Sequence, residues 1–160
     1  MTTTLQESVN NFTENPEAGR TRPAVTGTLA NGHVRLSAGP FNWDSDLPPA
    51  VGGGNQAPSP TAYLLGALAG CAVVFLNDTL APEFGVELDA VTATARCSAD
   101  LGGLLGIEGA DPALADLALD IAISSQSNPE SVDAMKAAWE ARCPIYLALL
   151  TPNRVTLSYT

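Results

Sequence analysis

The feature that most constrains this chain is a run of sixteen residues, 61–76, that carries no charged side chain. Ser59 can cap a helix and Pro60 suits the first helical position, so the run predicts a helix that begins there. The helix would be apolar on every side, which is typical of a membrane span or of the centre of a core. At about 1.5 Å per residue the run falls short of the ~30 Å hydrocarbon layer of a bilayer. We therefore expect a buried central helix, partly covered by a second subunit if the domain is a dimer.

The charge balance restricts the partners of the chain. Seven lysine and arginine residues stand against seventeen aspartate and glutamate residues, which gives a formal net charge of −10. Such a field repels phosphate backbones and anionic bilayers, so we expect neither nucleic acid nor a membrane surface as partner. A length of 160 residues with 46% hydrophobic residues suits one folded domain.

Few side chains of this sequence can bind a metal, and its amino terminus does not resemble a targeting signal. One histidine and three cysteines, without a Cys-x-x-Cys spacing, do not supply the ligand pairs of a structural zinc site, and we expect no metal or other cofactor. The first seven residues hold neither a basic residue nor an apolar run, unlike a secretory signal or a transit peptide. We expect a cytoplasmic protein, in which any pairing of thiols is transient or catalytic.

Turn signals and propensities predict a mixture of strands and helices. The Asn31-Gly32 dipeptide predicts a tight hairpin, and Pro82 is expected to close the central helix. Residues 1–23 are expected to form a loose lead-in with a short helix around residues 5–12, before a single domain over residues 24–160. The other predicted segments are strands at 24–29, 33–37, 86–96, 117–123 and 155–159, an irregular loop at 47–60, and a glycine-rich turn and strand edge at 101–106.

A second helix is predicted to start at Asn128-Pro129, a cap followed by a proline. Val132, Met135 and Trp139 follow at spacings of three and four, which places one apolar stripe toward the core. Cys143 falls four residues after Trp139 on the same stripe. Because Pro144 biases the preceding residue away from α geometry, we expect the helix to end or bend at this cysteine.

Two of the three cysteines are candidates for redox chemistry. A free cysteine is more often a small buried hydrophobe, but Cys71 and Cys143 each lie on the inward side of a predicted helix and could face one another. Cys143 lies near a helix C-terminus, where an anion is disfavoured, so Cys71 is the expected nucleophile and Cys143 its resolving partner. Cys71 lies too deep in its helix for the dipole to help and needs a cation to form a thiolate. The candidate cations are Arg20, Arg22, Arg35, Arg96, Arg142 and Arg154.

The remaining candidates have simpler explanations. We expect Cys97 to be structural, because free cysteine is frequently buried. His33, beside the predicted turn, is expected to be a solvated turn residue rather than a catalytic base. The glycines at 52–54 lack the Gly-Lys-Ser/Thr of a phosphate loop, so flexibility is their expected role.

Three stretches of the sequence together resemble the OsmC/Ohr family of osmotically induced and organic hydroperoxide resistance proteins: residues 46–53, 57–71 and 142–145. The likeness extends over about residues 24–160. It implies an α+β fold in which strongly bent antiparallel sheets wrap around two central helices, and an intertwined homodimer with two active sites at the subunit interface. In the peroxidases of the family, the cysteine that matches Cys71 attacks the peroxide, and the one that matches Cys143 resolves it as a disulfide.

Two positions depart from the pattern of those peroxidases. They carry a glutamate where this chain has Thr61, and an arginine in the turn where this chain has residues 30–33, with Arg35 the nearest arginine.

The leading hypothesis is a thiol-dependent peroxidase that reduces organic hydroperoxides through Cys71 and Cys143 and is restored by a dithiol. The alternatives are a non-enzymatic dimer that binds a small hydrophobic ligand or senses redox state, and a reductase or carrier of another thiol compound.

Overall fold

The structure is a computed structural model that describes residues 4–151 and 155–159. The chain divides into two compact units, Met1–Ser59 and Pro60–Thr160, which are described separately. Helices and strands are mixed in the chain and the strand pairs are antiparallel, which confirms the predicted α+β class.

The first unit opens with helix α1 (Leu5–Glu14). A capping box formed by Thr4 and Glu7 stabilises its N-terminus. The Thr4 hydroxyl accepts from the backbone N–H of Glu7 at 3.3 Å, and the Glu7 carboxylate accepts from the backbone N–H of Thr4 at 2.7 Å. This helix lies where the sequence predicts one. The unit continues with η1 (Pro16–Gly19), β1 (Thr26–Ala30), β2 (His33–Ala38), β3 (Phe41–Ser45) and η2 (Pro49–Val51).

Strands β1, β2 and β3 form one antiparallel sheet in that order. Asn31 and Gly32 both have positive φ, 52° and 86°, which a two-residue hairpin turn requires, so the predicted hairpin is confirmed. Among the described residues of this unit, only Ser45 and Asp46 are fully buried. The sheet therefore lacks an apolar core of its own within the described chain.

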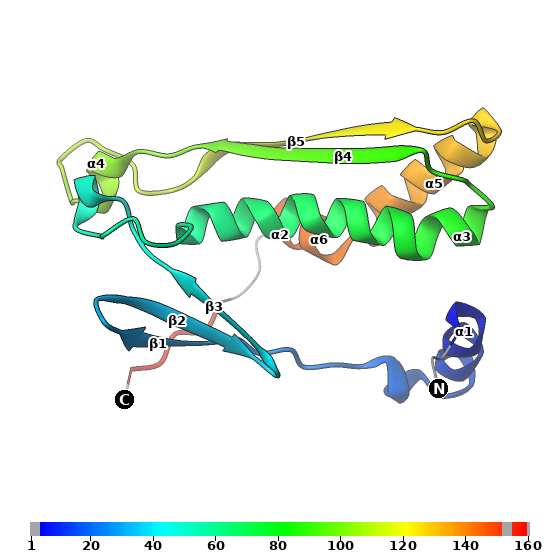
Figure 1. The fold of residues 1–160 in the computed structure, drawn as a ribbon, viewed down its shortest axis with the longest axis horizontal. Coiled ribbons are helices and arrows are strands. Elements are labelled where there is room, and N and C mark those ends of the chain that lie inside the picture. Colours follow the sequence, from blue (N-terminus) through cyan, green and yellow to red (C-terminus); the bar gives the residue numbers. More distant parts are fainter. Residues whose placement is uncertain (1–3, 152–154, 160) are drawn as a thin grey trace. The chain divides into compact units, whose positions relative to one another are not determined.

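The second unit is built on a long helical run (Figure 1). Helix α2 (Pro60–Phe75) continues through the π-helical turn η3 (Leu76–Leu80) into α3 (Ala81–Phe84). The prediction that Pro82 closes the central helix is wrong: Pro82 lies in the first turn of α3, where its missing N–H costs little. Gly85, with φ 62°, ends the run instead.

The continuous helix from Pro60 to Phe84 has 25 residues and is long and apolar enough to cross a membrane by length and composition alone. The prediction that this helix is too short to span a bilayer is therefore wrong. The central helix of a core passes the same test. Here Leu68, Ala72, Leu76 and Leu80 are buried, and Figure 1 shows β4 (Ala90–Ser98) and β5 (Ala115–Ser124) running alongside α2. This packing covers one side of the helix, and 28% of its apolar window is buried within the described chain.

The rest of the second unit packs against part of the surface of that helix. Strands β4 and β5 pair antiparallel, and a bulge interrupts their register between Arg96 and Ser98. The other helices are α4 (Leu101–Leu104), α5 (Pro129–Arg142) and α6 (Pro144–Leu150). The buried core cluster of the unit consists of Ala72, Leu76, Leu80, Ala81, Val86, Met135, Trp139 and Cys143.

Two predicted segments differ from the structure. Residues 101–106 hold the short helix α4 rather than a strand edge, because the Asp100 carboxylate caps it by accepting from the backbone N–H of Gly102 at 2.7 Å. Residues 155–159 form no strand, and all five residues are exposed. A strand needs a hydrogen-bonded neighbour, and the described chain pairs none with this segment.

Candidate active site

The two sulfur atoms predicted to face each other do so. Cys71 lies three turns into α2, and Cys143 lies at the junction between α5 and α6. Their Sγ atoms are 3.3 Å apart, although 72 positions separate the residues in sequence. The site is therefore formed by packing of the second unit and not by any local motif.

The position of Cys143 follows from the local sequence. The Asn128 side chain caps α5 by accepting from the backbone N–H of Glu130, and Met135 and Trp139 anchor the apolar stripe in the core. The backbone of Cys143 is extended, at φ −67° and ψ 112°, which ends α5 as predicted from Pro144. Cys143 lies at this junction and is fully buried.

Aromatic packing fixes the junction further. The rings of Trp139 and Tyr146, four residues before and three residues after Cys143 along the chain, have centroids 5.1 Å apart. The backbone N–H of Cys143 donates to the carbonyl of Trp139 at 2.9 Å, and its carbonyl accepts from Leu147 at 3.0 Å. Both main-chain polar groups of Cys143 are therefore satisfied, which leaves its thiol as the reactive group at the junction.

The distance between the sulfurs suits reversible bond formation. A disulfide has an S–S length of about 2.05 Å, so the sulfur atoms at 3.3 Å need only a small approach to bond. Since Cys71 is half-buried and Cys143 is buried, the pair is also largely screened from bulk thiols. The separation of the sulfurs is compatible with a dithiol and disulfide cycle.

The electrostatics of Cys71 oppose its ionisation in this conformation. Burial, the hydrogen bond with Cys143 and the charge of a Cys143 thiolate raise the pKa of Cys71 to about 11. The backbone N–H of Ile145 acts in the opposite direction, because it donates a hydrogen bond to the sulfur and so lowers the pKa. The net direction is upward, so the Cys71 thiol keeps its proton at neutral pH.

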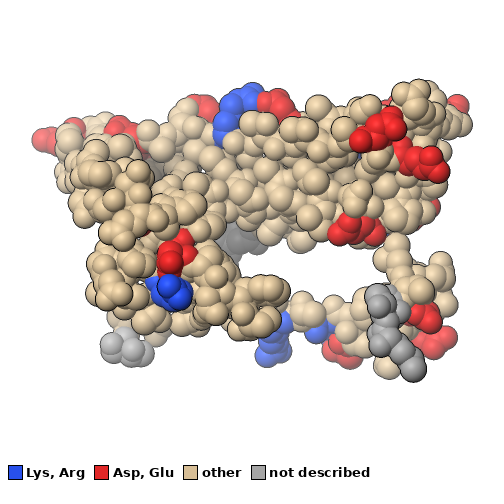
Figure 2. Space-filling model, in the orientation of Figure 1, with Lys and Arg blue, Asp and Glu red and all other residues tan. Residues whose placement is uncertain are grey.

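The predicted cation beside Cys71 is not in place among the described residues of this unit. Basic side chains are few on the face of the molecule shown in Figure 2. Arg96 is paired with Asp120 across β4 and β5, and Arg142 is paired with Glu83 at 2.7 Å. Arg154 lies outside the described residues. Of these arginines, Arg142 is the one that adjoins a cysteine of the pair in sequence.

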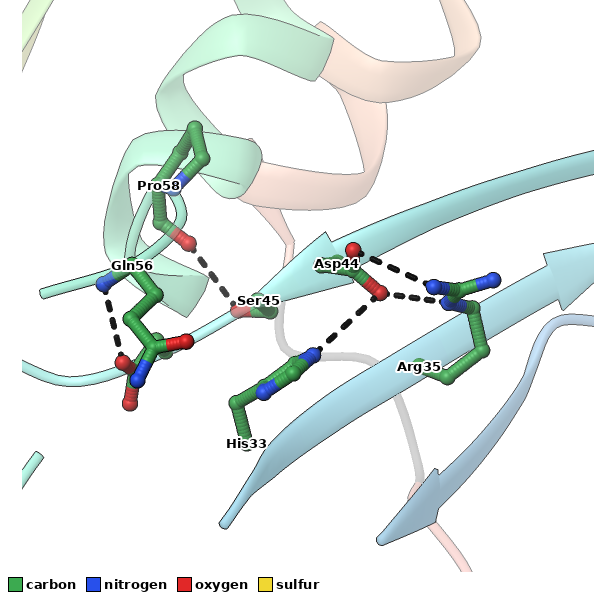
Figure 3. A network of polar contacts seen from close by, with 7 residues as sticks. His33, Arg35, Asp44, Ser45, Gln56 and Pro58 are labelled. Carbon is green, nitrogen blue, oxygen red and sulfur yellow. Dashed lines mark hydrogen bonds and ion pairs between the residues drawn. The ribbon is translucent and has the colours of Figure 1, made fainter. Parts of the chain in front are cut away.

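The first unit holds a separate polar network (Figure 3). The Asp44 carboxylate accepts from Arg35 Nε at 2.5 Å and lies 3.7 Å from His33 Nε2. The prediction that His33 is a solvated turn residue is wrong, because the turn consists of Asn31 and Gly32 and His33 begins β2. Its side chain is only 15% exposed. Arg35 is thus paired with Asp44 in this unit.

The loop that leads to α2 is organised by Asp46 at the end of β3. Its carboxylate accepts from the backbone N–H groups of Leu47, Gly54 and Gln56 at 2.7, 3.1 and 3.0 Å. The hydrogen bond from Gln56 is the largest of the effects that lower the pKa of Asp46. The glycine-rich segment predicted to be flexible is therefore anchored by an aspartate whose role the sequence did not indicate.

Sequence analysis identified both cysteines of the pair but missed their surroundings. The Glu83–Arg142 ion pair joins residues 59 positions apart, and no spacing pattern signals it. The third cysteine, Cys97, lies half-buried on the inner side of β4, away from the exposed positions of that strand. Its expected structural role stays a prediction.

The sequence profile of the family described as OsmC-like protein matches residues 52–158 of the chain. None of the curated proteins compared matches it. Because 52–158 includes both Cys71 and Cys143, the family match spans the whole dithiol.

Solved structures share the fold at low sequence identity. An OsmC-like protein from Mycoplasma pneumoniae has a TM-score of 0.66 at 19% identity, over 81% of this chain and 88% of that one. An organic hydroperoxide resistance protein from Elizabethkingia anophelis gives 0.58 at 19% identity, over 81% and 88%. An organic hydroperoxide resistance protein OsmC from Legionella pneumophila gives 0.56 at 16% identity, over 81% and 89%. The common element is the fold.

Proposed function

The chain belongs to the OsmC-like protein family, and from that premise we propose that it is a thiol-dependent peroxidase that reduces organic hydroperoxides. The observation that carries the proposal is the 3.3 Å separation of the Cys71 and Cys143 sulfurs. Two structural neighbours that are named organic hydroperoxide resistance proteins support the choice of substrate class.

The proposed reaction begins at Cys71. Its thiolate attacks the distal oxygen of the hydroperoxide, the O–O bond breaks, and the alkoxide leaves as an alcohol after taking a proton. Cys71 is thereby oxidised to a sulfenic acid. The Cys143 sulfur then attacks the Cys71 sulfur, the S–O bond breaks, water leaves, and a disulfide forms.

A dithiol reductant completes the cycle. It transfers two electrons and two protons to the Cys71–Cys143 disulfide, restores both thiols and is itself left as a disulfide. Because Cys143 is buried, exchange is expected to begin at the half-exposed sulfur of Cys71. The apolar surroundings of the pair, in the core cluster of the second unit, favour substrates with hydrocarbon groups over hydrogen peroxide.

The proposal includes a homodimer. The first unit buries only Ser45 and Asp46 among its described residues, while Leu29 and Phe41 are 79% and 70% exposed. A contiguous apolar patch that is exposed on a sheet marks an interaction surface. A second copy of the chain is the covering partner that we propose.

One observation favours the alternative of a non-enzymatic binding protein. A cavity of about 340 Å³ in the second unit is lined mostly by apolar side chains from β5 and α5, among them Leu119, Ile121 and Trp139. This volume lies within the range of small-molecule sites, roughly 300–1,000 Å³. Under this alternative, native mass spectrometry would show a retained hydrophobic ligand, and the thiols would stay free in mild oxidant.

The proposed function is tested by comparing the amount of hydroperoxide consumed with the amount of alcohol formed. Fully reduced protein is expected to consume cumene hydroperoxide and to form cumyl alcohol in equal amounts, and a dithiol is expected to sustain the reaction. The same protein with its thiols blocked by N-ethylmaleimide serves as the control for consumption that does not need thiols. Equal rates for the reduced and the blocked protein would refute the peroxidase proposal.

A further inference from the structure

The cavity that β5 and α5 line has a mostly apolar wall with two aromatic rings in it. Its volume is about 340 Å³, and β5 contributes Leu119, Ile121 and Ile123 to the wall. Trp139 of α5 and Tyr146 of α6 also line the cavity, and the centroids of their rings are 5.1 Å apart. A wall of this kind suits a small molecule with a hydrocarbon body.

One polar atom in this wall has no hydrogen-bond partner within the described part of the chain. Trp139 is only 5% exposed, and its indole Nε1 is buried without an acceptor among those residues. A buried indole N–H usually donates to an acceptor, because burial removes its hydrogen bonds to water. Since Trp139 lines the cavity, a molecule held there can supply the missing acceptor.

The charges at the cavity select against ionic ligands. Lys136 and Glu140 both line it, and the Lys136 ammonium also donates to the Asp133 carboxylate at 2.9 Å. An anionic ligand therefore meets no unopposed cation, and the net charge of −10 on the chain disfavours it further. An ammonium group would meet carboxylates, but it has no lone pair with which to accept from the indole N–H. A neutral oxygen acceptor satisfies both conditions.

We propose that this cavity is a binding site for a neutral, apolar ketone or ester, and that Trp139 Nε1 donates a hydrogen bond to the carbonyl oxygen of the ligand. The hydrocarbon part of the ligand packs against the aliphatic side chains of β5. Cys71 and Cys143 are not among the described residues that line the cavity. The inference therefore concerns a site other than the dithiol and goes beyond the proposed peroxidase activity.

The test is equilibrium dialysis of the full-length protein against three naphthalene derivatives that share one ring system. In 2-acetylnaphthalene the side group is a ketone, in 2-isopropenylnaphthalene a C=CH2 group replaces the carbonyl, and 2-naphthoate is an anion. The ketone is expected to bind saturably and about fivefold or more tightly than the alkene, because the alkene leaves the indole N–H without an acceptor. Naphthoate is expected to bind less tightly than the ketone. In Trp139→Phe the ketone and the alkene should bind with equal affinity.

Two further variants show whether the ligand occupies the cavity. Ile121→Trp places a larger ring in the wall and is expected to weaken binding of the ketone by at least about tenfold. Ala122→Trp adds the same ring at the neighbouring, exposed position of β5 and is expected to leave the affinity unchanged. The unfolding midpoint of each variant checks that the fold persists.

Three results would overturn the inference. The first is the absence of saturable ketone binding to the parent protein, which is also the outcome if a second copy of the chain covers the cavity. The second is equal affinity of the parent for the ketone and the alkene, which needs no variant to fold. The third is a preference for the ketone that persists in Trp139→Phe. Because dialysis requires no peroxide, each of these results is independent of the proposed peroxidase activity.

Discussion

Replacing Cys71 by serine is expected to lower the rate of hydroperoxide consumption by at least about a hundredfold. A serine hydroxyl at this position cannot form the thiolate that attacks the peroxide, and the buried Cys143 cannot take its place. The measurement is the loss of cumene hydroperoxide in the presence of excess dithiol. Serine is close in size to cysteine, so the fold should persist, and the unfolding midpoint checks this.

Matched variants separate the three thiols. Cys97→Ser is expected to keep the rate of the parent protein, because Cys97 lies on β4 and not on the helices that carry the pair. Cys143→Ser is expected to react once and then accumulate a sulfenic acid on Cys71, which a sulfenic-acid reagent such as dimedone captures. Consumption by Cys71→Ser at the rate of the parent would show that another group carries the chemistry.

In the reduced parent protein, we expect Cys71 to be almost entirely protonated at pH 7. A pKa of about 11 leaves roughly one thiolate in ten thousand at pH 7, against a few per cent for an ordinary thiol. A raised pKa means that the sulfur keeps its proton to higher pH, so reaction with iodoacetamide at pH 7 should be slow. We expect it to be about a hundredfold slower than for N-acetylcysteine.

The pH profile gives the sign of this effect. The alkylation rate of Cys71 should rise about tenfold per pH unit above neutrality and level off only near pH 11. Peptide mapping assigns the label to Cys71 rather than Cys97. A plateau that is already reached near pH 7 would show a thiolate stabilised in the resting protein, in conflict with the rise in pKa that burial causes.

Much of the second unit was predictable because its signals are local. Pro60 and Asn128 mark the starts of α2 and α5, and Pro144 sets the bend at Cys143. The inward position of Cys143 follows from the apolar stripe of Met135 and Trp139 once the start of α5 is known. These features need no knowledge of distant residues, and the structure confirms each of them.

The features that sequence analysis missed depend on packing between distant segments. The helix continues past Pro82 because the π-helical turn η3 precedes it. Pro82 then lies in the first turn of the next helix, α3. The predicted strand at residues 155–159 has β propensity, but propensity does not supply a neighbouring strand. The Glu83–Arg142 pair and the burial that raises the pKa of Cys71 likewise arise only when α2, α3 and α5 pack together.

The central claim is that Cys71 and Cys143 form one redox couple, and the most direct test is the product of a single oxidation. Reduced protein is treated with one equivalent of cumene hydroperoxide, quenched by alkylation of free thiols, and digested for mass spectrometry. The account predicts a peptide pair joined through Cys71 and Cys143, with Cys97 alkylated. Alkylation of all three cysteines, or a disulfide that includes Cys97, would contradict it.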